Sequence, residues 1–253
     1  MRGGLTFGKK LGVSRNCLRG GEAAAKMRGM FRPENFLDLK QFPFPELFDG
    51  CDNVWDALKK LPEFIKQHLK PARLGTTLGT PYIADDVLIG KGTVVEHGAT
   101  IKGPAIIGER CQVRSSAYVR GDVIVGNECV LGNASEFKNS VLFHNVQVPH
   151  FSYVGDSILG YKTHLGAGVI LSNVKSIKGN VAVKYGNNID TGLRKFGAVI
   201  GDWSDIGCNC VLNPGSIIGR NCVLYPNVLW RGVCPADSIV KLRQQHEIIV
   251  RRK

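Results

Sequence analysis

The residues best suited to chemistry gather in one stretch of the chain, residues 131–177. Within it, His150 stands between Pro149 and Phe151. An imidazole among apolar neighbours can serve as a general base near neutral pH, because small changes of environment move its pKa across that range. A lone histidine is more often structural, so the residues around His150 have to decide its role.

Two cations form a second candidate group. Arg120 and Lys138 lie eighteen residues apart, the first before this stretch and the second inside it. If the fold stacks them on one face, their charges repel, and an anion that bridges them would relieve the repulsion. Two solvated surface charges are the simpler alternative. The choice depends on the elements that carry the two side chains.

Both cations and the histidine lie within a six-residue repeat. A large aliphatic or aromatic residue recurs at every sixth position over residues 83–137, and a mostly small residue precedes it by two. The step shortens to five at Leu142 and again at Leu159, both inside the stretch that holds the histidine, and the repeat returns over 200–230. Neither a helix nor an ordinary strand keeps a period of six on one face.

This period predicts an all-β fold, a left-handed parallel β-helix of hexapeptide repeats. Three repeats make one triangular coil of roughly eighteen residues, in which the aliphatic and small residues both point inward. Stacked coils then place Arg120 and Lys138 about 4.8 Å apart on one outer face. Because each coil is stabilised by its neighbours, a charge at an inward position should strongly destabilise the coils around it.

The other segments flank this β-helix, which we assign to residues 83–231. Residues 1–29 form a basic leader that we predict to be disordered; a transit peptide would have this composition, and a plain tail or an overlong start is the alternative we favour. Residues 30–70 should form a helical cap of two short helices that packs on one end of the β-helix. Residues 71–82 are predicted as a linker and residues 232–253 as a C-terminal tail.

The composition of the chain limits the classes of partner that we expect it to bind. The formal net charge of +12 favours acidic partners, but residues 1–29 hold seven of the Lys and Arg residues, and no pattern resembles a nucleic-acid recognition module. No apolar run is long enough to span a bilayer, so we expect a soluble, cytoplasmic protein that binds neither nucleic acid nor membrane. Four cysteines occupy inward positions of the repeat and should be small buried side chains: Cys111, Cys129, Cys210 and Cys222.

Zinc ligation is the main alternative for the histidines. One class of β-helix enzymes, the γ-type carbonic anhydrases, binds zinc through three histidines of adjacent subunits. His144, His150 and His164 are spaced by six and fourteen residues, unlike the pattern of that class. A site built on Cys208 and Cys210 would lack further ligands. The sequence therefore predicts no metal site.

Several motifs resemble one family. GNASEFKNS, PHFSYVGDSILG, HLGAGVILSN and KFGAVIGD are similar to the acetyltransferase half of bacterial bifunctional N-acetylglucosamine-1-phosphate uridyltransferase/glucosamine-1-phosphate acetyltransferase. The resemblance covers about residues 83–245. It implies acetyl-CoA as a co-substrate, an amino-sugar phosphate or sugar nucleotide as partner, and a homotrimer with sites between subunits. Only 82 residues precede the repeats and they show no βαβ pattern, so we expect no uridyltransferase domain.

The resemblance also implies roles for individual residues. His150 matches the base that deprotonates the sugar amine. Substrate-binding residues are matched by Arg120, Lys138, Tyr153, His164, Asn173 and Lys195. Coenzyme-binding residues are matched by Ala167, Asn173, Val174, Cys208, Pro226 and Arg243, with Ala167 acting through its main-chain N–H.

The chain departs from the family at four places. His164 stands where the family has a substrate-contacting Asn, and Cys208 stands where it has a Ser. Pro226, which has no N–H, replaces an Ala whose N–H the family uses. The segment between Asn173 and Lys195 is longer than in the family. These changes bear on which sugar, and which acyl donor, the site accepts.

The sequence thus predicts an acetyl-CoA-dependent N-acetyltransferase for an amino-sugar phosphate, with glucosamine-1-phosphate as the expected acceptor, in UDP-N-acetylglucosamine-type biosynthesis. The alternative is a catalytically silent β-helix that binds sugar nucleotides or protein partners. His150 and Asn173 favour the enzyme, whereas His164, Cys208 and Pro226 favour the silent module.

Overall fold

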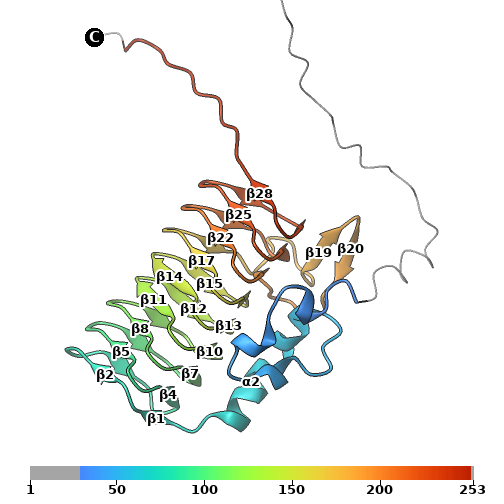
Figure 1. The fold of residues 1–253 in the computed structure, drawn as a ribbon. Helices are drawn as coiled ribbons and strands as arrows, with labels where there is room; N and C mark the ends of the chain where they lie inside the picture. Colours follow the sequence, from blue (N-terminus) through green and yellow to red (C-terminus); the bar gives the residue numbers. More distant parts are fainter. Residues whose placement is uncertain (1–28, 252–253) are drawn as a thin grey trace, which may run out of the picture.

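The computed structural model describes residues 29–251, which form a parallel β-helix with a helical segment along its side (Figure 1). Three parallel sheets run the length of the β-helix, and a coil contributes one short strand to each. The predicted all-β class and hexapeptide coil are confirmed. Apart from Gly29, the predicted leader lies outside the described residues. No described helix is long and apolar enough to cross a membrane.

The strands of each sheet follow one another at intervals of one coil. Sheet A contains β1 (Ala72–Arg73), β4 (Val87–Ile89), β7 (Ala105–Ile107), β10 (Val123–Val125), β13 (Ser140–Leu142), β16 (Ile158–Leu159), β21 (Ala198–Ile200), β24 (Ser216–Ile218) and β27 (Val233–Cys234). Sheet B contains β2 (Thr76–Thr77), β5 (Val94–Val95), β8 (Gln112–Val113), β11 (Val130–Asn133), β14 (Gln147–His150), β17 (His164–Leu165), β22 (Asp205–Ile206), β25 (Val223–Leu224) and β28 (Ile239–Val240). Sheet C contains β3 (Tyr82–Ile83), β6 (Thr100–Ile101), β9 (Tyr118–Val119), β12 (Glu136–Lys138), β15 (Tyr153–Gly155), β18 (Ile170–Leu171), β23 (Val211–Leu212) and β26 (Leu229–Trp230).

The repeat residues stack inside the coils. Val119 pairs with Phe137 in the next coil, eighteen residues on, and Phe137 pairs with Val154 after only seventeen. The shorter coil is the consequence of the five-residue step, which tightens one corner. The four cysteines at small positions are buried, as their inward orientation requires, and so are the large repeat residues except Ile83 and Trp230, which are partly buried near the two ends.

The β-helix extends beyond the range assigned from the repeat. Strands β1 and β2 lie in the segment predicted as a linker, and β27 and β28 lie in the predicted tail. These strands escape the pattern because they cap the two ends, where a coil has a neighbour on one side only and the inward positions are less strictly apolar.

The N-terminal segment contains one α-helix where the sequence predicted two. Four 3-10 turns, η1 (Pro33–Asn35), η2 (Leu39–Gln41), η3 (Pro45–Phe48) and η4 (Val54–Asp56), precede α2 (Ala57–His68), and Pro62 lies inside this helix. Leu58, Leu61 and Ile65 bury one face of α2 at helical spacing. We attribute the continuity of the helix to this packing, which outweighs the hydrogen bond that Pro62 cannot donate.

The segment packs along the side of sheet A, and the prediction that it caps one end is wrong (Figure 1). The Phe42 ring stacks on Phe143 with 4.7 Å between centroids. Main-chain hydrogen bonds add to this contact: His144 donates to Gln41 and Asp202 donates to Phe36, each at 3.0 Å. The side is suited to such packing because the outward residue of successive sheet A strands is apolar and buried: Ile106, Ile124, Val141, Ile158, Val199 and Ile217.

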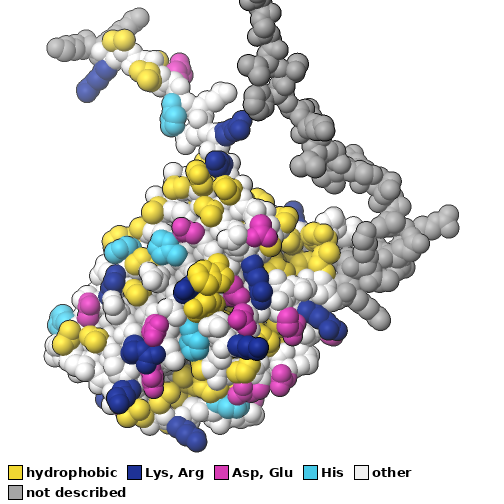
Figure 2. Space-filling model, viewed as in Figure 1, with side chains coloured by type: hydrophobic (Ala, Val, Ile, Leu, Met, Phe, Trp, Pro, Cys, Tyr) yellow, Lys and Arg dark blue, Asp and Glu magenta, His cyan; other side chains and the backbone are white. Residues whose placement is uncertain are grey.

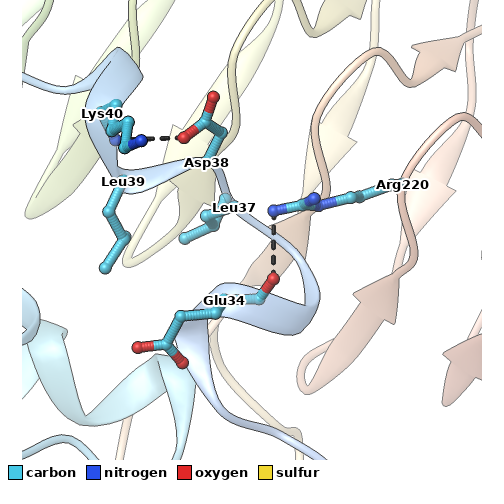
Figure 3. Close-up of a pocket in the computed structure, with 6 residues that line it drawn as sticks. All are labelled: Glu34, Leu37, Asp38, Leu39, Lys40 and Arg220. Carbon is cyan, nitrogen blue, oxygen red and sulfur yellow. Dashed lines mark hydrogen bonds between the residues drawn. The ribbon is translucent and has the colours of Figure 1, made fainter.

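Two charged residues join the segment to the later coils. The buried Asp202 carboxylate accepts from the main-chain N–H of Asp38 at 2.6 Å and of Tyr161 at 2.8 Å, and burial raises the pKa of Asp202. Arg220 lies 3.5 Å from Asp202 and donates to the main-chain oxygen of Glu34 at 3.1 Å (Figure 3). These contacts tie residues far apart in the sequence into one body.

The long segment after Asn173 forms an antiparallel hairpin of β19 (Ala182–Tyr185) and β20 (Asn187–Asp190). The hairpin packs against β24 and β27 of sheet A. The Tyr185 ring meets Phe31 edge-on, with 6.0 Å between centroids. The insertion therefore lies beside the N-terminal segment, on the same side of the β-helix.

Candidate functional site

Many of the predicted site residues fall into two columns, one at each end of the sheet C strands. The first column lies at the corner between sheets B and C and contains Asn133, His150, Ala167, Cys208 and Pro226. Main-chain hydrogen bonds join its coils: Phe151 donates to Asn133, Gly168 to His150, Asn209 to Ala167 and Asn227 to Cys208, at 2.9 to 3.2 Å. The predicted base and three predicted coenzyme contacts therefore occupy equivalent positions of successive coils.

The second column lies at the corner between sheets C and A. It consists of Asp122, Asn139, Asp156 and Asn173, each seventeen residues from the next. The first three have left-handed φ angles of 53°, 46° and 48°. Asn and Asp tolerate this conformation better than most residues, so they suit a corner that a five-residue step makes tight.

Asp156 is the centre of a buried cluster in this column. Its carboxylate, 3 % exposed, accepts from Lys138 Nζ at 3.0 and 3.1 Å and from Asn139 Nδ2 at 2.8 Å. Asn173 Nδ2 also donates to Asp156, and it lies within hydrogen-bond distance of the Tyr153 hydroxyl at 3.1 Å. Three predicted substrate-binding residues are thus held together by a carboxylate that the sequence analysis did not single out.

The Tyr153 side chain folds back over its own strand. A Cβ at Gly155 would come within 2.5 Å of the Tyr153 hydroxyl, so a larger residue at this position would displace the Tyr153 side chain. Burial raises the pKa of Tyr153, and the hydrogen bond from Asn173 opposes the rise only in part. The hydroxyl therefore stays protonated at neutral pH and can donate to a ligand.

Arg120 and Lys138 stack as the repeat predicted, because the pairs Tyr118–Glu136 and Val119–Phe137 directly precede them in β9 and β12. Each cation, however, has its own carboxylate. Arg120 Nη1 lies 2.8 Å from Glu136, and Lys138 Nζ contacts Asp156. The anions beside the two cations are side chains of the chain itself.

His164, Cys208 and Pro226 line one pocket of about 350 Å³ on sheet B. Val223, Leu224 and Ile206 add an apolar wall. His164 Nδ1 lies 2.8 Å from the carboxylate of Asp205, its partner in the next strand. The pocket therefore combines an apolar surface with one oriented imidazole.

His150 is exposed, and its ring lies 5.7 Å from that of Phe151, which is itself 57 % exposed. Within residues 29–251, nothing accepts a hydrogen bond from the main-chain N–H of Ala167, one coil away. Among the same residues, no three His, Cys, Asp or Glu side chains are placed to hold a metal ion. The corner thus presents an imidazole beside an available N–H donor.

Besides Arg120, Lys138, Tyr153 and His164, three further predicted residues belong to neither column. Lys195 is exposed at the end of the insertion, and Arg243 is exposed beyond β28, in the last described part of the chain. Val174 follows Asn173, is 43 % exposed and lines a neighbouring pocket. On the face shown in Figure 2, Lys and Arg side chains are interspersed with Asp and Glu instead of forming one basic patch.

Comparisons with known proteins identify the family of the chain. A model of the GMPPB C-terminal domain matches residues 101–193. The bifunctional protein GlmU of Methanococcus maripaludis is 32 % identical over 168 residues, which are 66 % of this chain and 41 % of that protein. YaiX of Escherichia coli, named as an uncharacterized acetyltransferase, is 33 % identical over 174 residues, 64 % of this chain and 76 % of YaiX. The chain belongs to the hexapeptide-repeat acetyltransferase family.

The chain thus spans about two fifths of the methanococcal member of this family. Among solved structures, the acetyltransferase domain of PglB from Neisseria gonorrhoeae, in complex with acetyl coenzyme A, is 12 % identical with a TM-score of 0.26. That match covers 64 % of this chain and 51 % of the domain.

Within this family fold, the residues missed from the sequence are Asp122, Asn139 and Asp156. A signal for them exists, because the seventeen-residue spacing that includes Asn173 follows directly from the two five-residue steps. Asp156 also lies within the quoted motif PHFSYVGDSILG. Reading the steps as tight corners would have placed all four side chains in one column.

Proposed function

We propose that this chain is an acetyl-CoA-dependent N-acetyltransferase whose acceptor is an amino-sugar phosphate, with glucosamine-1-phosphate as the first candidate. The observation that carries the proposal is the pair of columns on one chain of an acetyltransferase family. One column offers His150 beside the available Ala167 N–H, and the other gathers Lys138, Tyr153 and Asn173 around Asp156.

The first column supplies the reaction chemistry. The amine nitrogen of the sugar attacks the thioester carbonyl, and His150 accepts the proton that the nitrogen loses. The C–S bond then breaks, and the coenzyme leaves as a thiolate that takes up a proton. The Ala167 N–H can donate to the carbonyl oxygen as negative charge develops on it.

The coenzyme fits the neighbouring surface. The pocket that contains Cys208 and Pro226 is lined largely by apolar groups, which suits the thiol-bearing arm of coenzyme A. Pro226 offers no N–H, so the main-chain contact that the family makes there has to be replaced. We assign part of that replacement to the apolar wall formed by Val223 and Leu224.

The second column supplies substrate orientation. The hydroxyl of Tyr153 and the half-buried Lys138 present polar groups at the opposite end of sheet C from His150. This separation supports a homotrimer in which a neighbouring subunit completes each site, as the family resemblance implies. A cytoplasmic location and a role in UDP-N-acetylglucosamine-type biosynthesis belong to the same proposal.

Thiol release from acetyl-CoA in the presence of glucosamine-1-phosphate and related amino-sugar phosphates tests the proposal. His150→Ala should lower the turnover rate by roughly 10²–10⁴-fold, with little change in sugar-phosphate binding. Asp205→Asn is the informative companion, because it perturbs His164, the imidazole that lines the coenzyme pocket, and leaves His150 untouched.

Each result separates the alternatives. A wild-type protein that releases no thiol with any acceptor, yet binds a sugar nucleotide, would establish the silent binding module instead. If His150→Ala turns over at the wild-type rate while His164→Ala does not, the base is His164, oriented by Asp205.

A further inference from the structure

The phosphate of the proposed acceptor requires cations whose charge is not already neutralised by a carboxylate. Arg120 and Lys138, the predicted pair, do not meet this requirement. Arg120 and Lys138 lie 2.8 and 3.0 Å from Glu136 and Asp156, respectively. A phosphate that entered there would meet a carboxylate beside each cation. Like-charge contact of this kind weakens anion binding.

A second pocket, of about 460 Å³, lies further along the β-helix than Arg120 and Lys138. Lys175 and Arg231 line it, and within residues 29–251 neither lies within 4.0 Å of a carboxylate oxygen. The other lining residues are Ser172, Val174, Ser176, Ile177, Asn213 and Pro214. The lining therefore contains two cations, two hydroxyls and an amide, and no acidic side chain.

The fold places this pocket next to the cluster. Ser172, Asn213 and Arg231 directly follow the paired residues Leu171, Leu212 and Trp230, so they stack in one column at the end of sheet C. Ser172 immediately precedes Asn173, which donates to Asp156 in the cluster. Lys175 comes from the start of the insertion, which brings its cation over this column from outside the repeat.

We propose that this pocket is an anion subsite in which Lys175 and Arg231 bind a phosphate group of the substrate or of the coenzyme. The inference rests on the proposed function for the identity of its ligands, and it moves the phosphate site from Arg120 and Lys138 to the insertion. Guanidinium and ammonium groups bind phosphate through charge-assisted hydrogen bonds, which hydroxyl and amide donors can supplement. The exposed side chains of Val174 and Ile177 offer an apolar edge to the rest of the ligand.

Binding calorimetry on the full chain tests the subsite without any turnover. The probes are glucosamine-1-phosphate, coenzyme A and inorganic pyrophosphate, each titrated into the wild type, Lys175→Gln, Arg231→Gln and the double variant. Loss of one charge-assisted contact should weaken binding of the relevant probe roughly 10-fold or more. Lys178→Gln is the matched control, because Lys178 is an exposed lysine of the same insertion that does not line the pocket.

The three titrations show which ligand supplies the phosphate. Weaker binding of glucosamine-1-phosphate alone assigns the pocket to the acceptor, and weaker binding of coenzyme A alone assigns it to the donor. Pyrophosphate that binds the wild type more tightly than the double variant supports the subsite even if the chain proves to have no acetyltransferase activity. Unchanged affinities in variants that retain the wild-type melting temperature overturn the inference, as does a wild type that binds none of the three probes. Should the double variant not fold, the single variants carry the same comparison.

Discussion

Asp156→Asn should destabilise the fold more than any surface ion-pair change. The carboxylate is 3 % exposed and accepts from Lys138, Asn139 and Asn173. An amide at this position turns one acceptor into a donor that faces other donors, and it leaves the ammonium of Lys138 without its counter-charge. Asn keeps the left-handed corner conformation, so the substitution isolates the polar contacts from the backbone.

The expected loss is about 2–3 kcal/mol in the free energy of unfolding. Breaking a buried pair by removing one partner costs about 3–5 kcal/mol, and the Lys138 side chain keeps 24 % exposure, so water recovers part of this. Glu136→Gln is the matched control, because it removes the carboxylate beside Arg120, where the two side chains are 43 % and 31 % exposed. Exposed pairs contribute about 0–1 kcal/mol.

Urea unfolding of the two variants measures both losses. A double-mutant cycle that combines Asp156→Asn with Lys138→Met should give a coupling energy of about 1–3 kcal/mol. Equal losses for Asp156→Asn and Glu136→Gln, or a coupling near zero, would show that the cluster does not hold the corner together.

Three further outcomes are expected. Phe42→Ala should cost about 3–5 kcal/mol of unfolding free energy, because the ring is buried against Phe143; Phe151→Ala, at an exposed ring, should stay within about 0.5 kcal/mol, and similar losses would refute the packing argument. The pKa of Tyr153 is raised in the folded protein. The stability that this shift contributes is present below the ordinary tyrosine pKa of about 10 and is lost as the pH rises through the pKa of the folded state. An absorbance titration of the wild type against Tyr153→Phe should therefore show one phenol that ionises later than the others. Val125→Asp should abolish stable folding, because the side chain is fully buried in the coil, and an unchanged melting temperature would contradict this.

The sequence alone determined the coil. A period of six requires the same inward position in every strand, and the buried residues Val119, Phe137 and Val154 occupy it because only apolar side chains can fill the interior. The register followed as well, since a coil of eighteen residues stacks Arg120 between Lys102 and Lys138. Both conclusions depend on spacing along the chain, which is a local property.

The sequence could also have shown that the outer face of sheet A is covered. In every third repeat the outward residue is apolar, as at Ile124 and Val141, and such a strand is buried on both faces. The pattern shows that something covers this side. It does not show what, because the N-terminal segment, the hairpin and a partner chain all bury apolar surface equally well.

Tertiary structure alone decided which charges meet. Spacing places Lys138, Asp156 and Asn173 at one corner, but the distances of a hydrogen bond depend on how the side chains pack there. Whether Lys138 faces a ligand or a carboxylate is a difference of a few ångströms, and at such distances burial rather than sequence position sets the strength of the pair. The insertion behaves in the same way: its length is visible in the sequence, but only the folded hairpin shows that Lys175 lines a pocket with Arg231, because no repeat constrains where an inserted segment turns.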